Sequence, residues 1–275
     1  MGFLVKSADY TVLVPKSTDE IESFFRRHTF PYTIIPNYSC TIDDIEEPNS
    51  NQLSRLHYST GDDYLGILGE GYRDYELVSI GPNLFDLTFV FLAIIERMRH
   101  ENGEYSAHSS CARFDEKGIM CIGDRGAGKT SMCVELLSRG GQYISNERTV
   151  LKGTTICGGT TGLNDRDGFV GFYDCNSGVQ VSLVVKPRVF DHDLETVKYE
   201  RWREDLSLMT LFKETSNMIR CNGILIGDSV MPSLDSRELS ERRLKWAREF
   251  VKKVPFYFIE GSPRQITDMV EKLVG

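Results

Sequence analysis

The feature that most constrains the fold is the segment at residues 123–130, in which two glycines bracket four residues and are followed by Lys-Thr. An apolar run precedes it at residues 119–122, and residues 130–139 carry apolar side chains at helical spacing. Strand, loop and helix in this order bring backbone N–H groups together at a helix N-terminus, where the helix dipole favours an anion. A chance glycine-rich turn would match the letters without both flanks. The sequence therefore predicts a phosphate-binding loop between a strand and a helix.

Each part of this loop has an expected role at a nucleotide. The backbone would wrap the β-phosphate, the Lys129 ammonium would reach the β- and γ-phosphates, and the Thr130 hydroxyl would ligate magnesium. ATP and Mg²⁺ are therefore the expected cofactors, with ATP rather than GTP assumed. The residues expected to contact the nucleotide are Gly123, Asp124, Arg125, Gly126, Ala127, Gly128, Lys129, Thr130 and Ser131.

A nucleotide site of this kind also needs a carboxylate near the metal. Glu147 follows the strand-like residues 142–145, and Asp228 follows the apolar residues 223–227. The alternative for each carboxylate is an ordinary turn residue at a strand end, and for Asp228 this alternative is the commoner one. His108 lies 15 residues before Gly123, so a hairpin of residues 106–114 and 119–122 would return it to the loop. Without such a hairpin, a histidine on a strand is more often a packed or exposed residue.

Three further cations have two interpretations each. Lys186 and Arg188 follow the buried, strand-like residues 179–185, and they either face the phosphates or are surface cations at a strand end. Arg166 lies in the polar, glycine-rich residues 158–168, which form either a substrate-facing loop or the tip of a hairpin. In both cases the structural interpretation is the commoner one.

The rest of the chain divides at the loop of residues 101–104. Short alternating runs at residues 10–14, 32–35, 64–68 and 75–80 predict an antiparallel sheet, accompanied by helices at 18–27 and 82–100, the second capped by Asn83. Later residues alternate strands with helices at 130–139, 191–220 and 235–252, and a capping box at Ser262 opens a last helix. The prediction is a β-rich N-terminal region, residues 1–100, and an α/β (α+β) domain, residues 101–275.

The composition excludes several classes of partner. Forty acidic and 32 basic side chains give the 275-residue chain a net charge of −8, and an acidic chain repels nucleic acid and anionic membranes. The seven cysteines are odd in number and lack CxxC spacing, as in a reduced cytoplasmic protein. No signal peptide is evident, and the most apolar stretch, residues 84–95, is too short to cross a bilayer. We therefore expect a cytoplasmic protein without nucleic-acid or membrane partners.

Four segments around the loop resemble the catalytic domain of HPr kinase/phosphorylase and its relatives, including small kinases of peptide and natural-product gene clusters. The resemblance is specific over residues 105–150, loose over 180–205 and absent before residue 80. A later segment, Lys198-Tyr-Glu-Arg-Trp202, is similar to the family's Tyr-Asp-Arg element and nominates Arg201 as a phosphate contact. The specific segments are Ala107-His-Ser-Ser110, residues 118–130, Glu135-Leu-Leu-Ser-Arg-Gly140 and Tyr143-Ile-Ser-Asn-Glu147.

This resemblance implies an HPr-kinase-like P-loop core with a fold related to phosphoenolpyruvate carboxykinase, used for phosphoryl transfer to a hydroxyl. In the family, the first of two adjacent acids accepts the hydroxyl proton near the histidine, and the second helps to hold magnesium. The first acid is Asn146 here and the second is Glu147. An amide cannot act as a general base near neutral pH, although it can orient a hydroxyl.

Three interpretations of Asn146 follow. The base is Glu147 or His108; or the acceptor needs little base, because the transition state of phosphoryl transfer is loose; or the chain binds nucleotide without transferring phosphate. The family's phosphorylase activity is in doubt as well, because the helical region that docks its carrier protein is not recognisable in residues 235–275.

The sequence thus favours an ATP-dependent kinase that phosphorylates a hydroxyl of a small metabolite or biosynthetic intermediate. A serine kinase of a protein or peptide and a non-catalytic nucleotide-binding regulator are the alternatives. The acceptor itself is not indicated, and a homo-oligomer stays open because relatives often assemble. The expected catalytic residues are His108, Lys129, Asn146, Glu147 and Arg201, and the expected metal ligands are Thr130 and Glu147.

Overall fold

The computed structural model describes residues 3–7, 10–14, 53–59, 64–68, 74–78, 84–114, 116–160, 162–165, 168–173, 178–221, 225–226 and 229–275. The predicted helix at 18–27, the run at 32–35, the cap Asn83, and the candidates Arg166 and Asp228 lie outside these residues. By their contacts, the described residues up to Asn102 group with Ser216–Leu239 into one compact unit, and Gly103–Thr215 with Ser240–Gly275 into a second. The change at Asn102 falls next to the predicted division, but residues 216–239 belong to the first unit.

The first unit contains a five-stranded sheet and a long helix. Its strands follow the order β1-β2-β3-β5-β4, and β2–β3 and β3–β5 pair in parallel. The expectation of an antiparallel sheet is therefore wrong, because alternation shows which residues share a face and not which way the next strand runs. Parallel strands need a long connection, and residues 15–52 are available between β2 and β3. The strands are β1 (Phe3–Ser7), β2 (Tyr10–Val14), β3 (Leu53–Ser59), β4 (Tyr64–Leu68) and β5 (Asp74–Val78).

Helix α2 (Leu84–Glu101) confirms the helix predicted at 82–100. Residues 90–100 of α2 are all buried, including the ion pair in which Arg99 donates to Glu96 at 2.7 Å. The same unit holds the short pair β16 (Leu225–Ile226) and β17 (Ser229–Val230). Within the described part of the chain, none of the helices combines the length and apolarity that a bilayer crossing demands.

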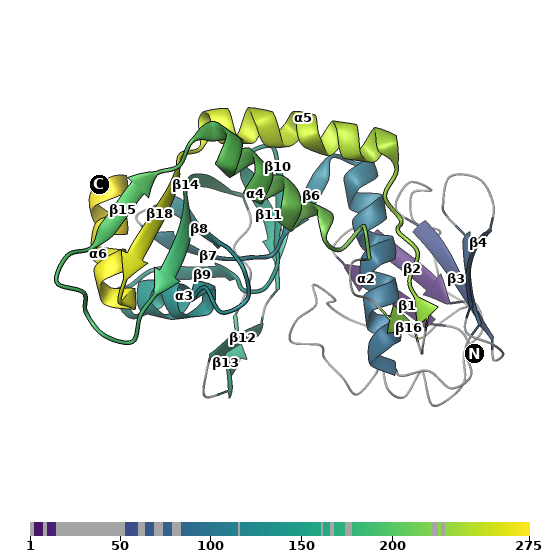
Figure 1. The fold of residues 1–275 in the computed structure, drawn as a ribbon. Coiled ribbons are helices and arrows are strands. Elements are labelled where there is room, and N and C mark those ends of the chain that lie inside the picture. The colour runs from purple at the N-terminus through teal and green to yellow at the C-terminus, as the bar shows by residue number, and fades with distance from the viewer. Residues whose placement is uncertain are drawn as a thin grey trace. The chain divides into compact units, whose positions relative to one another are not determined.

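The second unit is built on a mixed sheet of nine strands (Figure 1). At its centre β8, β14 and β18 run parallel, while β7, β9, β10, β11 and β15 pair antiparallel with their neighbours. A separate hairpin joins β12 (Gly162–Asp165) to β13 (Gly168–Phe172). The nine strands are β6 (Glu104–Ala107), β7 (Ser109–Phe114), β8 (Lys117–Ile122), β9 (Gln142–Ser145), β10 (Thr149–Lys152), β11 (Thr155–Gly159), β14 (Val179–Val189), β15 (Lys198–Arg201) and β18 (Phe256–Gly261).

Four helices belong largely to the second unit, and together with α2 they give a described chain of mixed α/β architecture with five helices. Residues 191–220, predicted as helical, instead contain β15 and α4, since only the later part has apolar side chains at helical spacing. The capping box predicted at Ser262 is confirmed: its hydroxyl accepts from the N–H of Gln265, and the Gln265 side chain accepts from the N–H of Ser262. The helices are α3 (Lys129–Ser138), α4 (Glu204–Ser216), α5 (Arg237–Lys253) and α6 (Pro263–Val274).

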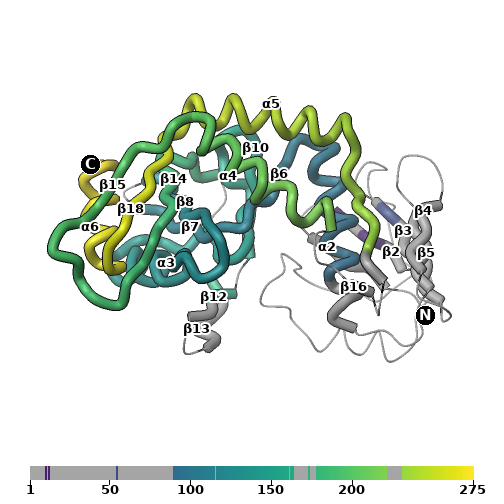
Figure 2. Tube along the Cα trace, in the orientation of Figure 1, coloured from purple at the N-terminus to yellow at the C-terminus, as the bar shows by residue number. Residues whose placement is uncertain are grey.

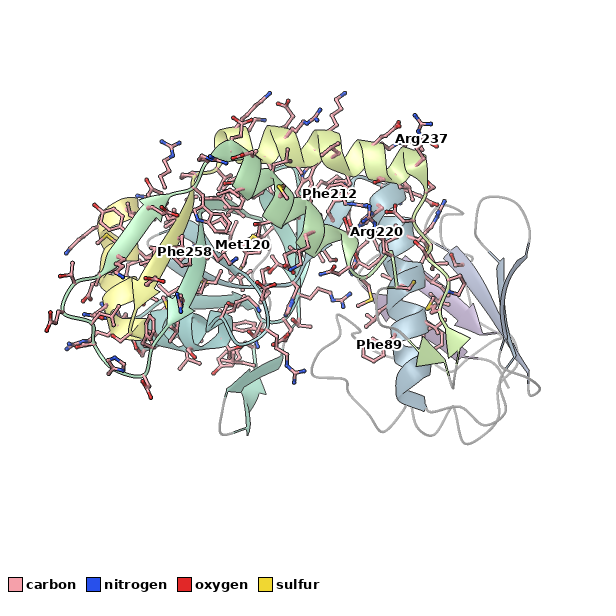
Figure 3. The ribbon with its side chains drawn as sticks, viewed as in Figure 1. Phe89, Met120, Phe212, Arg220, Arg237 and Phe258 are labelled. Carbon is pink, nitrogen blue, oxygen red and sulfur yellow. The ribbon has the colours of Figure 1, made fainter. Side chains whose placement is uncertain are left out.

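Successive side chains of β8 enter two different cores, as the two-residue period of a strand requires. Ile119 and Cys121 pack with α3 and α6 on one face of the sheet, whereas Met120 and Ile122 pack with α4 and α5 on the other. Figure 3 labels Met120 on β8 and Phe212 on α4. Because both faces of β8 are buried, the strand is a continuous apolar run, which explains why it was evident from the sequence.

This topology brings segments that are distant in the sequence close to the end of β8 where the loop begins; Figure 2 shows β7, β8 and α3 close together in the second unit. The predicted hairpin is confirmed, since β7 pairs antiparallel with β8 and Ser109 lies opposite Ile122. The expected strand 106–114 is divided at His108, where the chain leaves its pairing with β10 and begins its pairing with β8. Strand β9 runs antiparallel to β7, so its last residue also lies at the end of β8 where the loop begins.

Candidate active site

The loop between β8 and α3 has the backbone that its glycines predict. Gly123, Gly126 and Gly128 adopt φ values of 152°, 83° and 94°, which side-chain-bearing residues rarely adopt. Gly128 is also restricted by space, because a Cβ there would lie 2.5 Å from the Cβ of Val189 and closer still to one of its methyl groups. Gly128 caps α3, so the first free N–H groups of that helix open towards the loop.

Lys129 occupies the first position of α3 and is buried, with 7% of its surface exposed. Its ammonium donates to the carbonyls of Gly123 at 3.0 Å and Asp124 at 3.1 Å, so it lies inside the curve of the loop. Burial lowers its pKa, against the opposing influence of Glu147 and Glu214. The Ser110 hydroxyl donates to the Lys129 carbonyl at 2.7 Å and fixes the start of α3 against β7.

Asn146 follows β9 and lies beside the same helix terminus. Its Oδ1 accepts a hydrogen bond from the Thr130 hydroxyl at 3.2 Å. The residue is 1% exposed, and its Nδ2 finds no hydrogen-bond partner among the described residues. A buried amide donor without a partner is costly, which indicates a site that offers this nitrogen an oxygen atom.

Glu147 is held in a conformation that is unusual for a residue with a side chain. Its φ is 66°, and the N–H of Arg148 donates to the carbonyl of Asn146 at 2.8 Å across it, closing a three-residue turn. Such backbone strain concentrates at functional sites, where the surrounding structure enforces it. The turn directs the Glu147 carboxylate to His108, with Oε2 3.1 Å from Nε2. Glu147 and His108, which are 39 positions apart in the sequence, are therefore brought together.

A second carboxylate, which the sequence did not indicate, lies on the other side of the imidazole. Glu214 of α4 places Oε2 3.8 Å from Nδ1 of His108. The Glu214 side chain is 4% exposed, whereas those of His108 and Glu147 are 35% and 41% exposed. No local motif marks Glu214, because it is an ordinary helical glutamate until the sheet brings α4 over the histidine.

The two carboxylates differ in their ionisation. The hydrogen bond from His108 lowers the pKa of Glu147, outweighing burial. Burial raises the pKa of Glu214, and the charges of His108 and Lys213 offset this only in part. Titratable groups whose environments push their pKa values apart, around one histidine, form an arrangement suited to accepting and holding a proton.

A buried network of hydroxyl groups links the strands next to His108 and Asn146. Ser109 Oγ donates to Thr149 Oγ1 at 2.7 Å, and Ser145 Oγ lies 2.6 Å from the same Thr149 oxygen. All three residues are fully buried and come from β7, β9 and β10. Because these strands carry His108 and Asn146 at their ends, the network fixes the site to the sheet.

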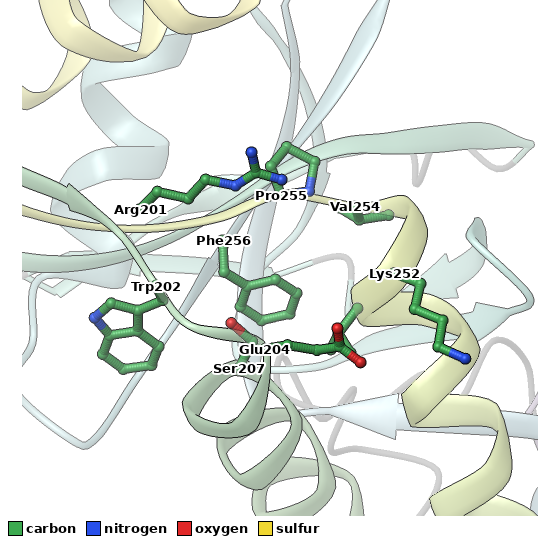
Figure 4. Close-up of a pocket in the computed structure, with 9 residues that line it drawn as sticks. Arg201, Trp202, Glu204, Ser207, Lys252, Val254, Pro255 and Phe256 are labelled. Carbon is green, nitrogen blue, oxygen red and sulfur yellow. The ribbon is translucent and has the colours of Figure 1, made fainter.

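Among the described residues, neither Arg201 nor Arg188, two cations nominated from the sequence, forms a hydrogen bond or ion pair with the loop, so their contact with phosphate stays a prediction. Arg201 lies opposite Tyr257 on the outer strand β15, so three strand spacings, about 14 Å, separate it from the level of Cys121 on β8. It lines a pocket of about 250 Å³ (Figure 4). Arg188 pairs with Glu260 at 3.0 Å. The pocket is lined by Arg201, Trp202, Glu204, Ser207, Val251, Lys252, Val254, Pro255 and Phe256.

The residues at the loop fit a nucleotide with magnesium. Among the described residues, no group of three or more His, Cys, Asp or Glu side chains could hold a metal ion by itself. Magnesium at a nucleotide takes most of its ligands from phosphates and water, with one or two from the protein. The Thr130 hydroxyl and the Glu147 carboxylate are hard oxygen ligands of the required kind, and the Asn146 amide donor fits an anionic oxygen.

Comparison with known proteins gives little beyond this geometry. No protein-family model matches the chain, and no curated protein matches it. A solved structure, the Hpr(Ser) kinase/phosphatase from Coxiella burnetii, is similar over 62% of this chain and 93% of that chain, at 12% identity and a TM-score of 0.28. At these values the similarity carries no argument about substrate or chemistry. The arrangement of the site itself therefore carries the functional conclusion.

Proposed function

We propose that this protein is an ATP-dependent kinase that transfers the γ-phosphate to a hydroxyl group of a small molecule. The observation that carries the proposal is the meeting, at one sheet edge, of an anion-binding loop and a histidine held between two carboxylates. A loop of this kind binds phosphate, and a proton-accepting group beside it suits an attacking hydroxyl.

The loop and its neighbours bind and orient the nucleotide. The N–H groups at the start of α3 point to the β-phosphate, and Lys129 exchanges its bonds to the Gly123 and Asp124 carbonyls for bonds to phosphate oxygens. Thr130 and Glu147 would hold magnesium directly or through water, and the metal would neutralise phosphate charge. Asn146 holds the Thr130 hydroxyl through Oδ1 and offers Nδ2 to an oxygen of the nucleotide or acceptor.

In the transfer step the acceptor oxygen forms a bond to the γ-phosphorus as the bond from that phosphorus to the bridging oxygen breaks. ADP leaves with the bonding electron pair, and the hydroxyl proton passes to the His108–Glu147 pair, whose Nε2 and Oε2 are 3.1 Å apart. Glu214 stabilises the positive charge of a protonated imidazole from the other side. Asn146 takes no proton, so the pair replaces the base that an amide cannot supply.

The two alternatives keep the same nucleotide site. A serine kinase of a protein or peptide would use the same proton acceptor with a larger substrate. A nucleotide-binding regulator would use the loop alone, and Asn146 motivates this alternative because it cannot act as a base.

The experiment incubates the full chain with γ-labelled ATP and Mg²⁺, with either a small-metabolite pool or cell protein as acceptor. We expect label in the metabolite fraction, and loss of both label and ADP release in Lys129→Ala, with the fold intact by circular dichroism. Lys152→Ala is the control, since Lys152 pairs with Glu104 at the ends of β10 and β6 that are opposite to the ends at Thr149 and Ala107 next to the site.

Each contrary result points to a different conclusion. Label in protein alone would favour the serine kinase, and ATP binding without ADP formation would favour the regulator. Turnover in Lys129→Ala equal to that of the unsubstituted protein would refute any function of the loop in phosphoryl transfer.

A further inference from the structure

Two lysines outside the loop motif converge on the loop residue Asp124. Lys213 of α4 places its ammonium 2.7 Å from Oδ1 of Asp124, and Lys186 of β14 lies 3.9 Å from Oδ2. These lysines come from elements 89 and 62 positions further along the chain, and both belong to the second unit. With Lys129, whose ammonium donates to the Asp124 carbonyl at 3.1 Å, three cations meet at one end of the loop.

Lys186 is held in place rather than extended freely into solvent. Its aliphatic chain packs on the loop, with Cγ 3.5 Å from the point where a Cβ on Gly123 would lie. Its ammonium lies 5.0 Å from the centre of the Trp202 ring, a cation–π contact. The side chain is 28% exposed. A cation fixed this close to the first loop glycine is positioned for an anion that the loop binds.

Lys213 is positioned by the helix that also provides Glu214. Two consecutive residues of α4 thus contact two different parts of the site: Lys213 contacts Asp124 in the loop, and Glu214 contacts His108. The Asp124 hydrogen bond raises the pKa of Lys213, which keeps the ammonium charged. The contact itself is readily exchanged, because the side chains of Asp124 and Lys213 are 65% and 59% exposed and such ion pairs are weak.

A polyphosphate should bind these lysine ammonium groups more strongly than the Asp124 carboxylate does. It carries more charge than a single carboxylate and offers several oxygens, and hydrogen bonds from lysine to phosphate are strengthened by charge on both partners. The Asp124 carboxylate belongs to the loop itself, so it forms ion pairs with the same two lysines that a phosphate bound in the loop would contact.

We propose that Lys186 and Lys213 are phosphate-binding residues of this site and that the Asp124 carboxylate competes with phosphate for them. The inference rests on the proposed nucleotide-binding function and adds to it two cations from β14 and α4. It also assigns Asp124 a negative effect on binding, whereas the motif treats that position as a generic loop residue.

The experiment measures binding of a non-hydrolysable ATP analogue with Mg²⁺, and of inorganic triphosphate, to the full chain by calorimetry. We expect Lys213→Gln and Lys186→Gln each to weaken binding of both probes by roughly tenfold. Asp124→Asn should tighten binding by about threefold or more, since it removes the competitor while keeping the shape. The Lys213→Gln penalty should grow in the Asp124→Asn background, where no carboxylate has to be displaced.

Matched controls are available in the same unit. Lys152→Gln alters a lysine that is also 59% exposed and pairs with Glu104, and Asp205→Asn alters a carboxylate of α4 that is 60% exposed and pairs with Arg203. Neither control should change binding of either probe. Melting temperatures measured for every variant show whether a binding change reflects a loss of folded protein.

Three results would overturn the inference and leave the proposed function standing, provided Lys129→Ala abolishes binding. These are unchanged binding in both lysine variants, weaker binding in Asp124→Asn, or a penalty seen with the nucleotide but not with triphosphate. If the unsubstituted protein binds neither probe, or Lys129→Ala binds as tightly, the proposed function fails first.

Discussion

Gly128→Ala tests the loop geometry most directly, because two independent costs act at that position. At a φ of 94° a residue with a Cβ is strained by about 1–2 kcal/mol. The new Cβ would also lie 2.5 Å from the Cβ of Val189, and forcing an extra carbon into packed space costs about 1–3 kcal/mol. We expect the free energy of unfolding of the second unit to fall by about 2–5 kcal/mol.

Gly126→Ala is the matched control for the strain alone. Gly126 has a φ of 83°, and nothing lies within 4 Å of a Cβ placed there. Its substitution should therefore cost only about 1–2 kcal/mol. The difference between the two variants measures the contact with Val189.

A second substitution identifies the colliding atoms. Val189→Gly removes both the Cβ and the methyl groups, so it should recover most of the packing cost in the Gly128→Ala background. Val189→Ala keeps the Cβ at 2.5 Å and should recover less. Neither change relieves the strained φ, so part of the loss should persist.

Urea unfolding followed by tryptophan fluorescence is the appropriate assay. Both tryptophans of the chain, Trp202 and Trp246, lie in the second unit, so the signal reports the unit that contains the loop. Equal losses in Gly126→Ala and Gly128→Ala, or no difference between the two Val189 backgrounds, would refute the close approach of Val189 to the loop.

The remaining predictions concern the residues around His108. Asn146→Asp should change turnover by less than about tenfold or increase it, as measured by ADP release, whereas total loss would show that the buried Nδ2 has a role of its own. Glu214→Gln should raise the free energy of unfolding at pH 7, because burial raises the Glu214 pKa and ionised Glu214 is unfavourable in the folded state. That gain should disappear as the pH falls below the unfolded-state pKa, about 4.3, where both states are protonated. Glu147→Gln should act in the opposite sense, since the His108 hydrogen bond lowers the Glu147 pKa; its loss of stability at pH 7 should vanish as the pH falls through the folded-state pKa. Urea titrations at pH 7 give the sign of both effects, and titrations at stepwise lower pH follow their disappearance. Shifts of the same sign at pH 7 would contradict the assignment.

The elements next to the loop could be predicted because their determinants are local. Strand β8 is a short apolar run buried on both faces, and α3 follows it after glycines that the turn requires. The capping box of α6 is encoded within four residues. Where a segment had no such local determinant, the prediction was less accurate: residues 191–220 contain a strand as well as a helix, and the N-terminal sheet is mixed rather than antiparallel.

The candidate site was predictable to the extent that it depends on sequence spacing. The β7–β8 hairpin returns His108 to the loop, and the strand after α3 ends just before Asn146 and Glu147, so spacing along the chain and the family resemblance were enough to nominate these residues. Arg201 was nominated by resemblance to a short sequence element; the structure places it on the outer strand β15, and its contact with phosphate stays a prediction. Glu214 and Lys213 could not be predicted from spacing or resemblance, because the composition of α4 does not indicate which strands the helix packs against.

The sequence was sufficient to predict the glycine-rich loop between β8 and α3, its lysine, and the histidine and glutamate beside it, because each depends on backbone conformation or on pairing between neighbouring strands. Which charged groups surround these residues depends on the tertiary structure. Packing of α4 over the sheet, which depends on the apolar core beneath it, places one carboxylate on the imidazole and one ammonium on the loop. The His108 hydrogen bond then lowers the pKa of Glu147, whereas burial raises the pKa of Glu214. This difference between the two glutamates depends on their surroundings and cannot be predicted from the sequence.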